Sequence, residues 1–318
     1  MMTERENALM AINGGVPKWV PDWMTCSSMI YPMALNPGNR AEMGGLDYFG
    51  VEWEFVPSCG APMVKPGTQK LTDITKWREQ VVFPDLEQYD WEVAAEMDTA
   101  HVDRETRIPM LTDVNGIFER AHALMGYEDL LMAMMEEPEE CYEFFGAIAD
   151  HKIALHRKYA QYYKPEWITY HDDWGNTKSL FFSPQTFREL IKPHTKRIVD
   201  NLLELGIIPE LHSHGKIELI MDDIVELGFK IVDPLEPVND LLTIREKYAG
   251  KICLCFGADT QGVTDIPGAT EEDIRADTRR AVDLARPGSA MVIGASIDQR
   301  VVGIFVDEAN RYAKSFCK

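Results

Sequence analysis

Residues 207–233 read IIPELHSHGKIELIMDDIVELGFKIVD, and this stretch contains the repeating unit of the predicted fold. The apolar run at 207–212 has the length of a buried strand, and 216–227 has the apolar spacing of a helix. A second apolar run follows at 229–232. Two buried strands joined by a helix run parallel, so the stretch predicts one strand–helix–strand unit of an α/β fold.

The same alternation continues in both directions from this unit. Further strands are predicted at 108–114, 167–171, 252–256 and 290–293, with helices between them at 138–163, 183–206, 239–248, 270–285 and 302–316. The chain contains neither G-x-G-x-x-G nor G-x-x-x-x-G-K-[ST], the glycine-rich turns typical of open doubly wound sheets. The 318 residues and the number of units favour a closed (β/α)8 TIM barrel, a single domain over residues 1–318.

The N-terminal third is less regular. Thr3 and Glu6 form a capping-box pattern that starts a helix, and this helix ends at Gly14 and Gly15. Residues 16–100 are rich in Pro, Trp, Met and Tyr without clear periodicity. We interpret them as long substrate-facing loops and early barrel strands, including one at 51–55.

Charge and composition exclude several classes of protein. The net charge of −20 leaves no basic footprint for nucleic acid, and charged residues interrupt every apolar run before it reaches membrane-spanning length. The six scattered cysteines form no C-x-x-C pair, and the polar N-terminus lacks a secretory signal. We therefore expect a cytoplasmic enzyme with reduced thiols and no nucleic-acid or membrane partner; an oligomer is compatible with the sequence.

Polar residues follow nearly every predicted strand. In a barrel these strand ends converge on one mouth, where catalysis takes place. Some of the carboxylates are expected only to cap the next helix. The residues are Asp113, Asn115, His171, Asp172, Asp173, His212, His214, Asp233, Glu236, Asp259, Ser296 and Asp298.

His212 and His214 form the most specific candidate motif for a metal site in the sequence. Residues two apart on a strand share a face, so both imidazoles can bind one zinc ion, completed by a carboxylate such as Glu236, Asp259 or Asp298. The alternative is that they are polar residues that line the mouth without a metal.

Four segments carry a family resemblance: TERENALMAINGGVPKWVP (3–21), TDVNGIFERA (112–121), HDDWGNTKSLFFSPQTFRELIKPHTKRIVD (171–200) and the stretch 255–294. They resemble the uroporphyrinogen decarboxylase superfamily. That superfamily is a (β/α)8 barrel, and it includes the haem-pathway decarboxylase and zinc-dependent methyltransferases that exchange methyl groups with corrinoid proteins.

Two departures separate these branches. The decarboxylase carries an R-Q-A-G-R motif after its first helix, whereas residues 21–40 here retain only Arg40, too few cations for a polyacid substrate. The methyltransferases carry H-x-C-G, where His214 here replaces the cysteine. A His- and carboxylate-rich site suits oxygen ligands, and the HDDWG form resembles the ether-cleaving, O-demethylating methyltransferases.

The resemblance implies transfer of a methyl group from a methoxylated small molecule to the Co(I) of a separate corrinoid protein. The density of Trp, Tyr, Phe and Met in residues 19–64 favours an aromatic substrate. The chain has no D-x-H-x-x-G corrinoid motif, so the corrinoid must arrive on a partner. Zinc on His212 and His214, a general acid, or both would activate the ether oxygen. The predicted catalytic residues are His171, Asp172 and Asp173, with Asp47, Asn115, Glu236 and Asp259 binding substrate.

Adjacent residues on an extended chain point to opposite sides, so only one of Asp172 and Asp173 should face the substrate. The other should hold a neighbouring helix or the His171 ring. Two other functions stay open. One is a decarboxylase-like lyase that acts on a small acid without metal through Asp47 or Asp173. The other is a docking module for a corrinoid carrier.

Overall fold

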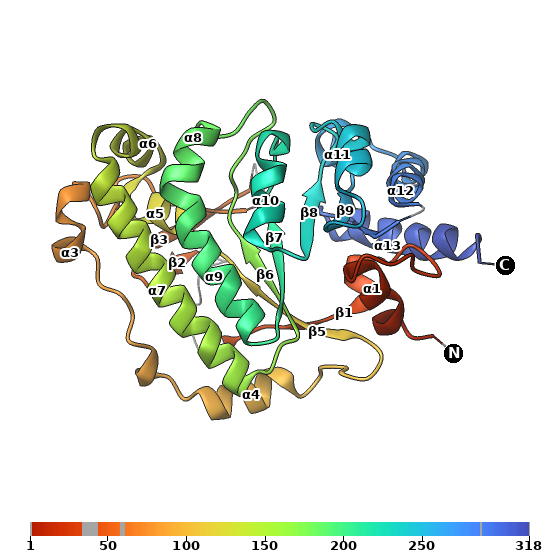
Figure 1. The fold of residues 1–318 in the computed structure, drawn as a ribbon, viewed down its shortest axis with the longest axis horizontal. Helices are drawn as coiled ribbons and strands as arrows, with labels where there is room; N and C mark the ends of the chain where they lie inside the picture. The colour runs from red at the N-terminus through yellow and green to blue at the C-terminus, as the bar shows by residue number, and fades with distance from the viewer. Residues whose placement is uncertain (1, 34–43, 58–60, 287, 318) are drawn as a thin grey trace.

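The computed structural model describes residues 2–33, 44–57, 61–286 and 288–317, so Arg40 and Cys59 lie outside the described residues. Its centre is a curled parallel sheet (Figure 1). Seven strands make up this sheet within the described residues: β1 (Ser27–Ile30), β5 (Ile108–Asp113), β6 (Trp167–His171), β7 (Ile208–His212), β8 (Ile231–Leu235), β9 (Cys253–Gly257) and β10 (Ala290–Ile293).

The sheet curls back on itself. Its strands follow chain order from β1 to β10, and every neighbouring pair is parallel. A parallel bridge between Asp22 and Val292 then links the segment before β1 to β10, with Val292 N donating to Pro21 O at 3.0 Å. The predicted α/β barrel is confirmed.

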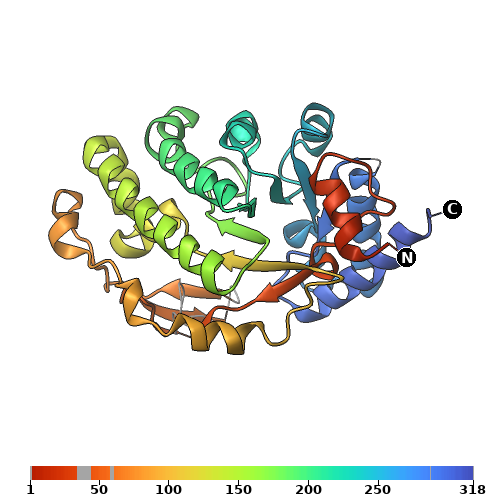
Figure 2. The ribbon, with the colours of Figure 1, turned by 60° about the horizontal axis from the view of Figure 1, so that its bottom comes forward.

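Helices cover the outside of the sheet (Figure 2). The first and last helices lie side by side, and Lys314 Nζ pairs with Glu4 Oε1 at 2.7 Å. The helices are α1 (Glu4–Ile12), α2 (Trp23–Cys26), α3 (Trp77–Gln80), α4 (Trp91–Thr99), α5 (Ile117–Met125), α6 (Tyr127–Glu136), α7 (Pro138–Tyr162), α8 (Pro184–Thr186), α9 (Lys192–Glu204), α10 (Met221–Leu227), α11 (Leu241–Tyr248), α12 (Glu271–Ala285) and α13 (Gln299–Lys314).

Local sequence explains most of these boundaries. The predicted capping box at Thr3 and Glu6 starts α1, and Thr270 with Asp273 forms a second one at α12. All five residues of β8 and of β9 are buried, as expected for parallel strands covered by helices on one side and a packed interior on the other. No helix in the described part of the chain has the length and apolar character needed to cross a membrane.

The prediction of a barrel strand at 51–55 was wrong. This segment is β3 (Glu52–Val56), the middle strand of a separate antiparallel sheet with β2 (Gly45–Leu46) and β4 (Ala61–Val64). Acidic residues alternate with Trp53 and Phe55 along β3, and only Trp53 is buried. Such alternation is typical of a half-exposed antiparallel strand, whereas the strands of a parallel barrel are buried on both faces.

Candidate metal centre

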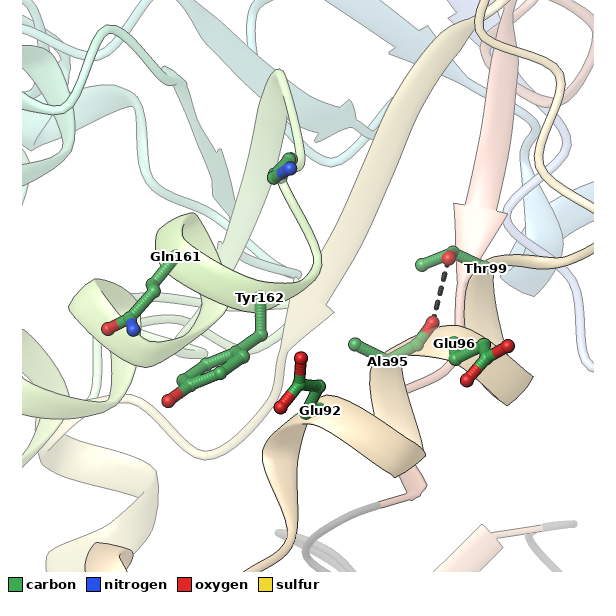
Figure 3. A pocket seen from close by; sticks show the side chains of 7 residues that line it. Glu92, Ala95, Glu96, Thr99, Gln161 and Tyr162 are labelled. Carbon is green, nitrogen blue, oxygen red and sulfur yellow. Dashed lines mark hydrogen bonds between the residues drawn. The ribbon is translucent and has the colours of Figure 1, made fainter.

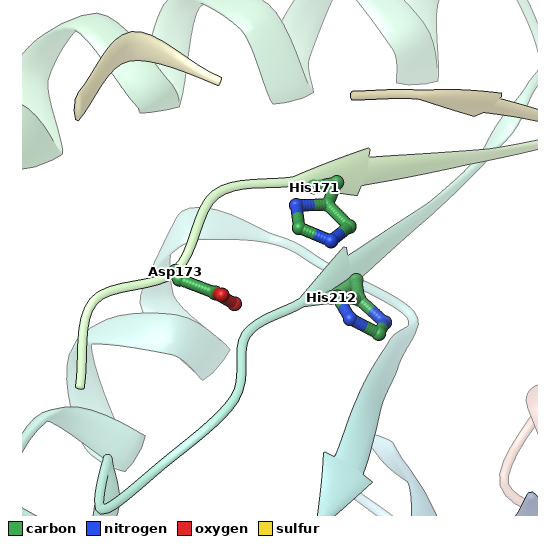
Figure 4. Close-up of side chains that lie close together, drawn as sticks. All are labelled: His171, Asp173 and His212. Carbon is green, nitrogen blue, oxygen red and sulfur yellow. The ribbon is translucent and has the colours of Figure 1, made fainter. Parts of the chain in front are cut away.

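His171 and His212 lie side by side at the mouth of the barrel. They are the last residues of β6 and β7, and the register of the two strands pairs them directly. Their rings stack with centroids 4.3 Å apart and 20° between the planes. Two histidines that are 41 positions apart in the sequence therefore present their imidazoles to the same space (Figure 4).

Asp173 completes a group of three. It lies on the loop after β6, and its carboxylate points toward the two histidine rings (Figure 4). One ligand atom from each of the three residues lies within 4.8 Å of the others, and this is the one group of its kind among the described residues. Small side-chain movements would bring these atoms to the spacing of ligands around a single ion.

A buried carboxylate lies within hydrogen-bonding distance of the Nδ1 atom of each histidine. His171 Nδ1 lies 2.9 Å from Glu119 Oε2, and His212 Nδ1 lies 3.0 Å from Asp233 Oδ2. Burial lowers the pKa of His212 despite the opposing effect of Asp233, and nearby imidazoles lower it further. The neutral imidazole is the form that binds a metal, so the pKa shift favours ligation.

His214 lies outside the group of three. Its side chain is 39% exposed, and its Nδ1 lies 3.3 Å from Glu236 Oε1. Although burial opposes the effect, Glu236 and Asp173 raise the pKa of His214 to about 9, so its imidazole is protonated at neutral pH. The structure thus gives the two histidines of the H-x-H motif different partners.

Asp172 and Asp173 point in different directions, as expected for adjacent residues. Asp172 is fully buried, and its carboxylate accepts hydrogen bonds from the backbone N–H groups of Phe118 at 3.2 Å and Glu119 at 2.8 Å. Burial, with the charge of Glu119, raises its pKa to about 7. Asp172 therefore caps α5, and a Cβ at Gly116 would lie only 2.3 Å from its side chain.

The four residues predicted to bind substrate are spread over different environments. Glu236 is buried beside His214, and it accepts a hydrogen bond from Gly215 N at 2.7 Å. Asn115 is buried with a left-handed φ of 57°. Asp259 caps the turn that follows β9, where its Oδ1 accepts from Gly262 N at 2.7 Å.

The carboxylate of Asp47 forms its ion pair and hydrogen bonds with groups of the protein itself. Its carboxylate forms a buried ion pair of 2.6 Å with Arg120. It also accepts hydrogen bonds from the backbone N–H groups of Phe49 and Val51 and from the indole of Trp53. The side chain thus holds the small antiparallel sheet to α5.

Sequence reasoning did not identify the roles of three buried carboxylates near the histidines. Glu119 lies on α5 without a distinguishing motif, and Asp233 was noted only as a polar strand end. Glu210, inside β7, accepts hydrogen bonds from the indoles of Trp23 and Trp167, both at 2.9 Å. Burial and the charge of Asp233 raise the pKa of Glu210 well above its ordinary range. A buried Glu two residues before His212 was the available signal.

A separate surface pocket of about 350 Å³ lies between α4 and the end of α7 (Figure 3). Because α7 leads into the start of β6, this pocket lies toward the N-terminal ends of the strands. None of the residues predicted for the site lines it. Its lining is Glu92, Ala95, Glu96, Thr99, Gln161, Tyr162 and Lys164.

Comparison with a known structure agrees with this architecture. A methyltransferase from Methanosarcina mazei aligns with a TM-score of 0.75 and 13% sequence identity, over 98% of this chain and 99% of that chain. A 3-keto-L-gulonate-6-phosphate decarboxylase from Vibrio cholerae aligns with a TM-score of 0.31 and 15% identity, over 69% of this chain and 91% of that chain. At this identity the first match establishes the fold, and the low TM-score of the second supports no conclusion.

A search of curated proteins found no match. The family model described as uroporphyrinogen decarboxylase (URO-D) matches residues 43–301, most of the chain. This match agrees with the parallel barrel and with the resemblance of the four sequence segments. The chain belongs to the uroporphyrinogen decarboxylase (URO-D) family.

Proposed function

We propose that this protein is a metal-dependent methyltransferase that moves a methyl group from a methoxylated aromatic molecule to the Co(I) of a separate corrinoid protein. The observation that carries the proposal is the group formed by His171, Asp173 and His212 at the C-terminal ends of β6 and β7. Enzymes with this barrel place their chemistry at that end of the strands.

The donor set fits zinc. Catalytic zinc sites hold the ion with three nitrogen, oxygen or sulfur ligands and keep a further position open for substrate or water. Two imidazoles and one carboxylate supply three such ligands here. The ligand set that we propose thus contains His212, as the sequence predicts, together with His171 and Asp173 in place of His214.

Methyl transfer breaks the bond between the methyl carbon and the ether oxygen, and it forms a bond from that carbon to cobalt. The departing alkoxide or phenoxide is a poor leaving group. A zinc ion held by His171, Asp173 and His212 would supply a Lewis acid at the ether oxygen. The protein itself orients the ether and supplies a proton to the departing oxygen.

His214 is the residue that we propose for this proton. It is partly exposed at the mouth, its ring lies 4.8 Å from that of His212, and Glu236 holds its Nδ1. With a pKa raised to about 9, the ring carries a proton at neutral pH that it can donate. Asp172 lies fully buried against α5, which supports a positioning role for it.

The metal-free lyase has less support. That reaction needs Asp47 or Asp173 at a substrate, but the Asp47 carboxylate accepts four hydrogen bonds within the protein and is 4% exposed. Asp173 lies against two histidines, an arrangement that suits a metal ligand.

The test combines metal analysis with a methyl-transfer assay. The purified protein should contain zinc, and under anaerobic conditions it should methylate a corrinoid protein reduced to Co(I) when a methoxylated aromatic compound is added. Chelation should abolish transfer, and added zinc should restore it. Turnover of the ether without any corrinoid protein, or full activity after complete removal of metal, would contradict the proposal.

A further inference from the structure

We infer that Glu119 and Asp233 are positioning residues that set the tautomer and the ring orientation of His171 and His212, so that both rings offer Nε2 to one metal ion. The inference rests on the metal site of the proposed function. It does not depend on the identity of the methyl donor.

Glu119 reaches His171 from the helix layer. Its side chain is 6% exposed, and its Oε2 lies 2.9 Å from His171 Nδ1. The start of α5 is attached to the end of β6 at further points: Asp172 accepts from the backbone N–H of Glu119, and Gly116 N donates to His171 O at 2.7 Å. These contacts leave Glu119 little freedom to move relative to the ring that it holds.

Asp233 reaches His212 from within the sheet. The register of β7 and β8 pairs the two residues, and Asp233 Oδ2 lies 3.0 Å from His212 Nδ1. Asp233 is fully buried, and its backbone carbonyl accepts from Ser213 N at 2.8 Å. The carboxylate is therefore held by the strand itself, independently of α5.

The two contacts have the same chemical consequence. A neutral imidazole that donates its Nδ1–H to a carboxylate carries its lone pair on Nε2, and the carboxylate makes that nitrogen a stronger ligand. Without the carboxylate a ring can turn over and exchange the places of its two nitrogens. With both carboxylates in place, the two stacked rings direct Nε2 toward the same metal ion. Glu119 of α5 holds the His171 ring, and Asp233 of β8 holds the His212 ring.

The first experiment uses metal-free protein labelled with ¹⁵N at histidine, so its outcome does not depend on activity. The chain has eight histidines, and the signals of the two can be assigned with His171→Gln and His212→Gln. We expect both rings to show the Nδ1–H tautomer. Glu119→Ala should change the signal of His171, and Asp233→Ala that of His212. A wild-type protein with Nε2–H rings would overturn the inference.

The second experiment measures zinc affinity by competition with a chelator. Glu119→Ala and Asp233→Ala should each weaken binding by about 10- to 100-fold, as for other outer carboxylates of metal sites. Glu119→Gln and Asp233→Asn should restore most of the affinity, because an amide oxygen still accepts the Nδ1–H. Glu308→Gln is the matched control, since this buried carboxylate bonds Arg275, Arg279 and Arg311. It should lose stability with unchanged zinc affinity.

Alanine variants that bind zinc as tightly as the wild type, or a control that loses affinity as much as they do, would also overturn the inference. A protein that shows the expected tautomers and affinities but transfers no methyl group would contradict the proposed function and support the positioning roles.

Discussion

The rings of His171 and His212 stack 4.3 Å apart because neighbouring parallel strands end with them in register. Two imidazoles at this distance repel each other when both are protonated, and burial together with the neighbouring imidazoles lowers the pKa of His212. Three carboxylates lie around the two rings. Asp173 belongs to the same candidate metal group, and Glu119 and Asp233 lie at the Nδ1 atoms of His171 and His212. Two neighbouring imidazoles and the surrounding carboxylates form a donor set that suits a divalent cation.

Replacing the proposed ligands should remove the metal. His171→Ala, His212→Ala and Asp173→Ala should each lose most of the bound zinc, because three ligands are the minimum for a stable catalytic site. Elemental analysis of the purified variants measures this loss. His101→Ala is the control, since His101 is exposed and bonds the backbone of Met29. Stoichiometric zinc in the His171→Ala/His212→Ala double variant would show that these residues are not ligands.

His214→Ala should keep the zinc and lose activity. General acid catalysis is worth about a hundred- to ten-thousand-fold in rate, so kcat on an ether with a poor leaving group should fall by that order, and far less on an activated ether. In the metal-free protein Glu236 and Asp173 raise the pKa of His214 to about 9 against the opposing effect of burial, so its ring should titrate near that pH in ¹⁵N spectra of the histidines. Loss of zinc from His214→Ala would instead return His214 to the ligand set.

Asp172→Asn should act on stability and its pH dependence. The pKa of Asp172 is raised to about 7 in the folded protein from 3.8, so its contribution to stability is fully present below 3.8 and is lost as the pH rises through about 7. Each unit of such a shift corresponds to about 1.4 kcal/mol. The free energy of unfolding of metal-free protein can be measured with urea from about pH 4 to about pH 8, a range that spans both pKa values of Asp172. It should decrease more steeply with rising pH in the wild type than in Asp172→Asn. Parallel curves would contradict the raised pKa.

Gly215→Ala should damage the site through the backbone. Gly215 has a φ of 87°, and a Cβ there would lie 2.4 Å from the carbonyl carbon of Gly175 on the loop that carries Asp173. Left-handed strain of about 1–2 kcal/mol adds to overpacking of about 1–3 kcal/mol. Gly206→Ala is matched in φ, at 74°, but meets nothing within 4 Å, so it should lose only the strain. Equal thermal stabilities and zinc contents in the two variants would contradict this view.

The barrel could be predicted from local sequence patterns. Alternation of buried, mainly apolar strands with amphipathic helices is a local property, and it located β5, β6, β7, β8, β9 and β10 to within a few residues. It failed at 51–55, where a mixed apolar and acidic pattern belongs to an antiparallel sheet outside the barrel. The strand ends also indicated which segments contribute polar residues to the mouth.

Which of those polar residues lie close together depends on how distant strands and helices pack. Strand parity would place His212 and His214 on one face if the strand continued, but β7 ends at His212, and Gly215 turns the chain with a left-handed φ. His171 meets His212 through the pairing of β6 with β7, and Glu119 reaches them from a helix. These contacts depend on sheet register and helix packing, which bring distant parts of the chain together. The local periodicity of the sequence therefore does not predict them.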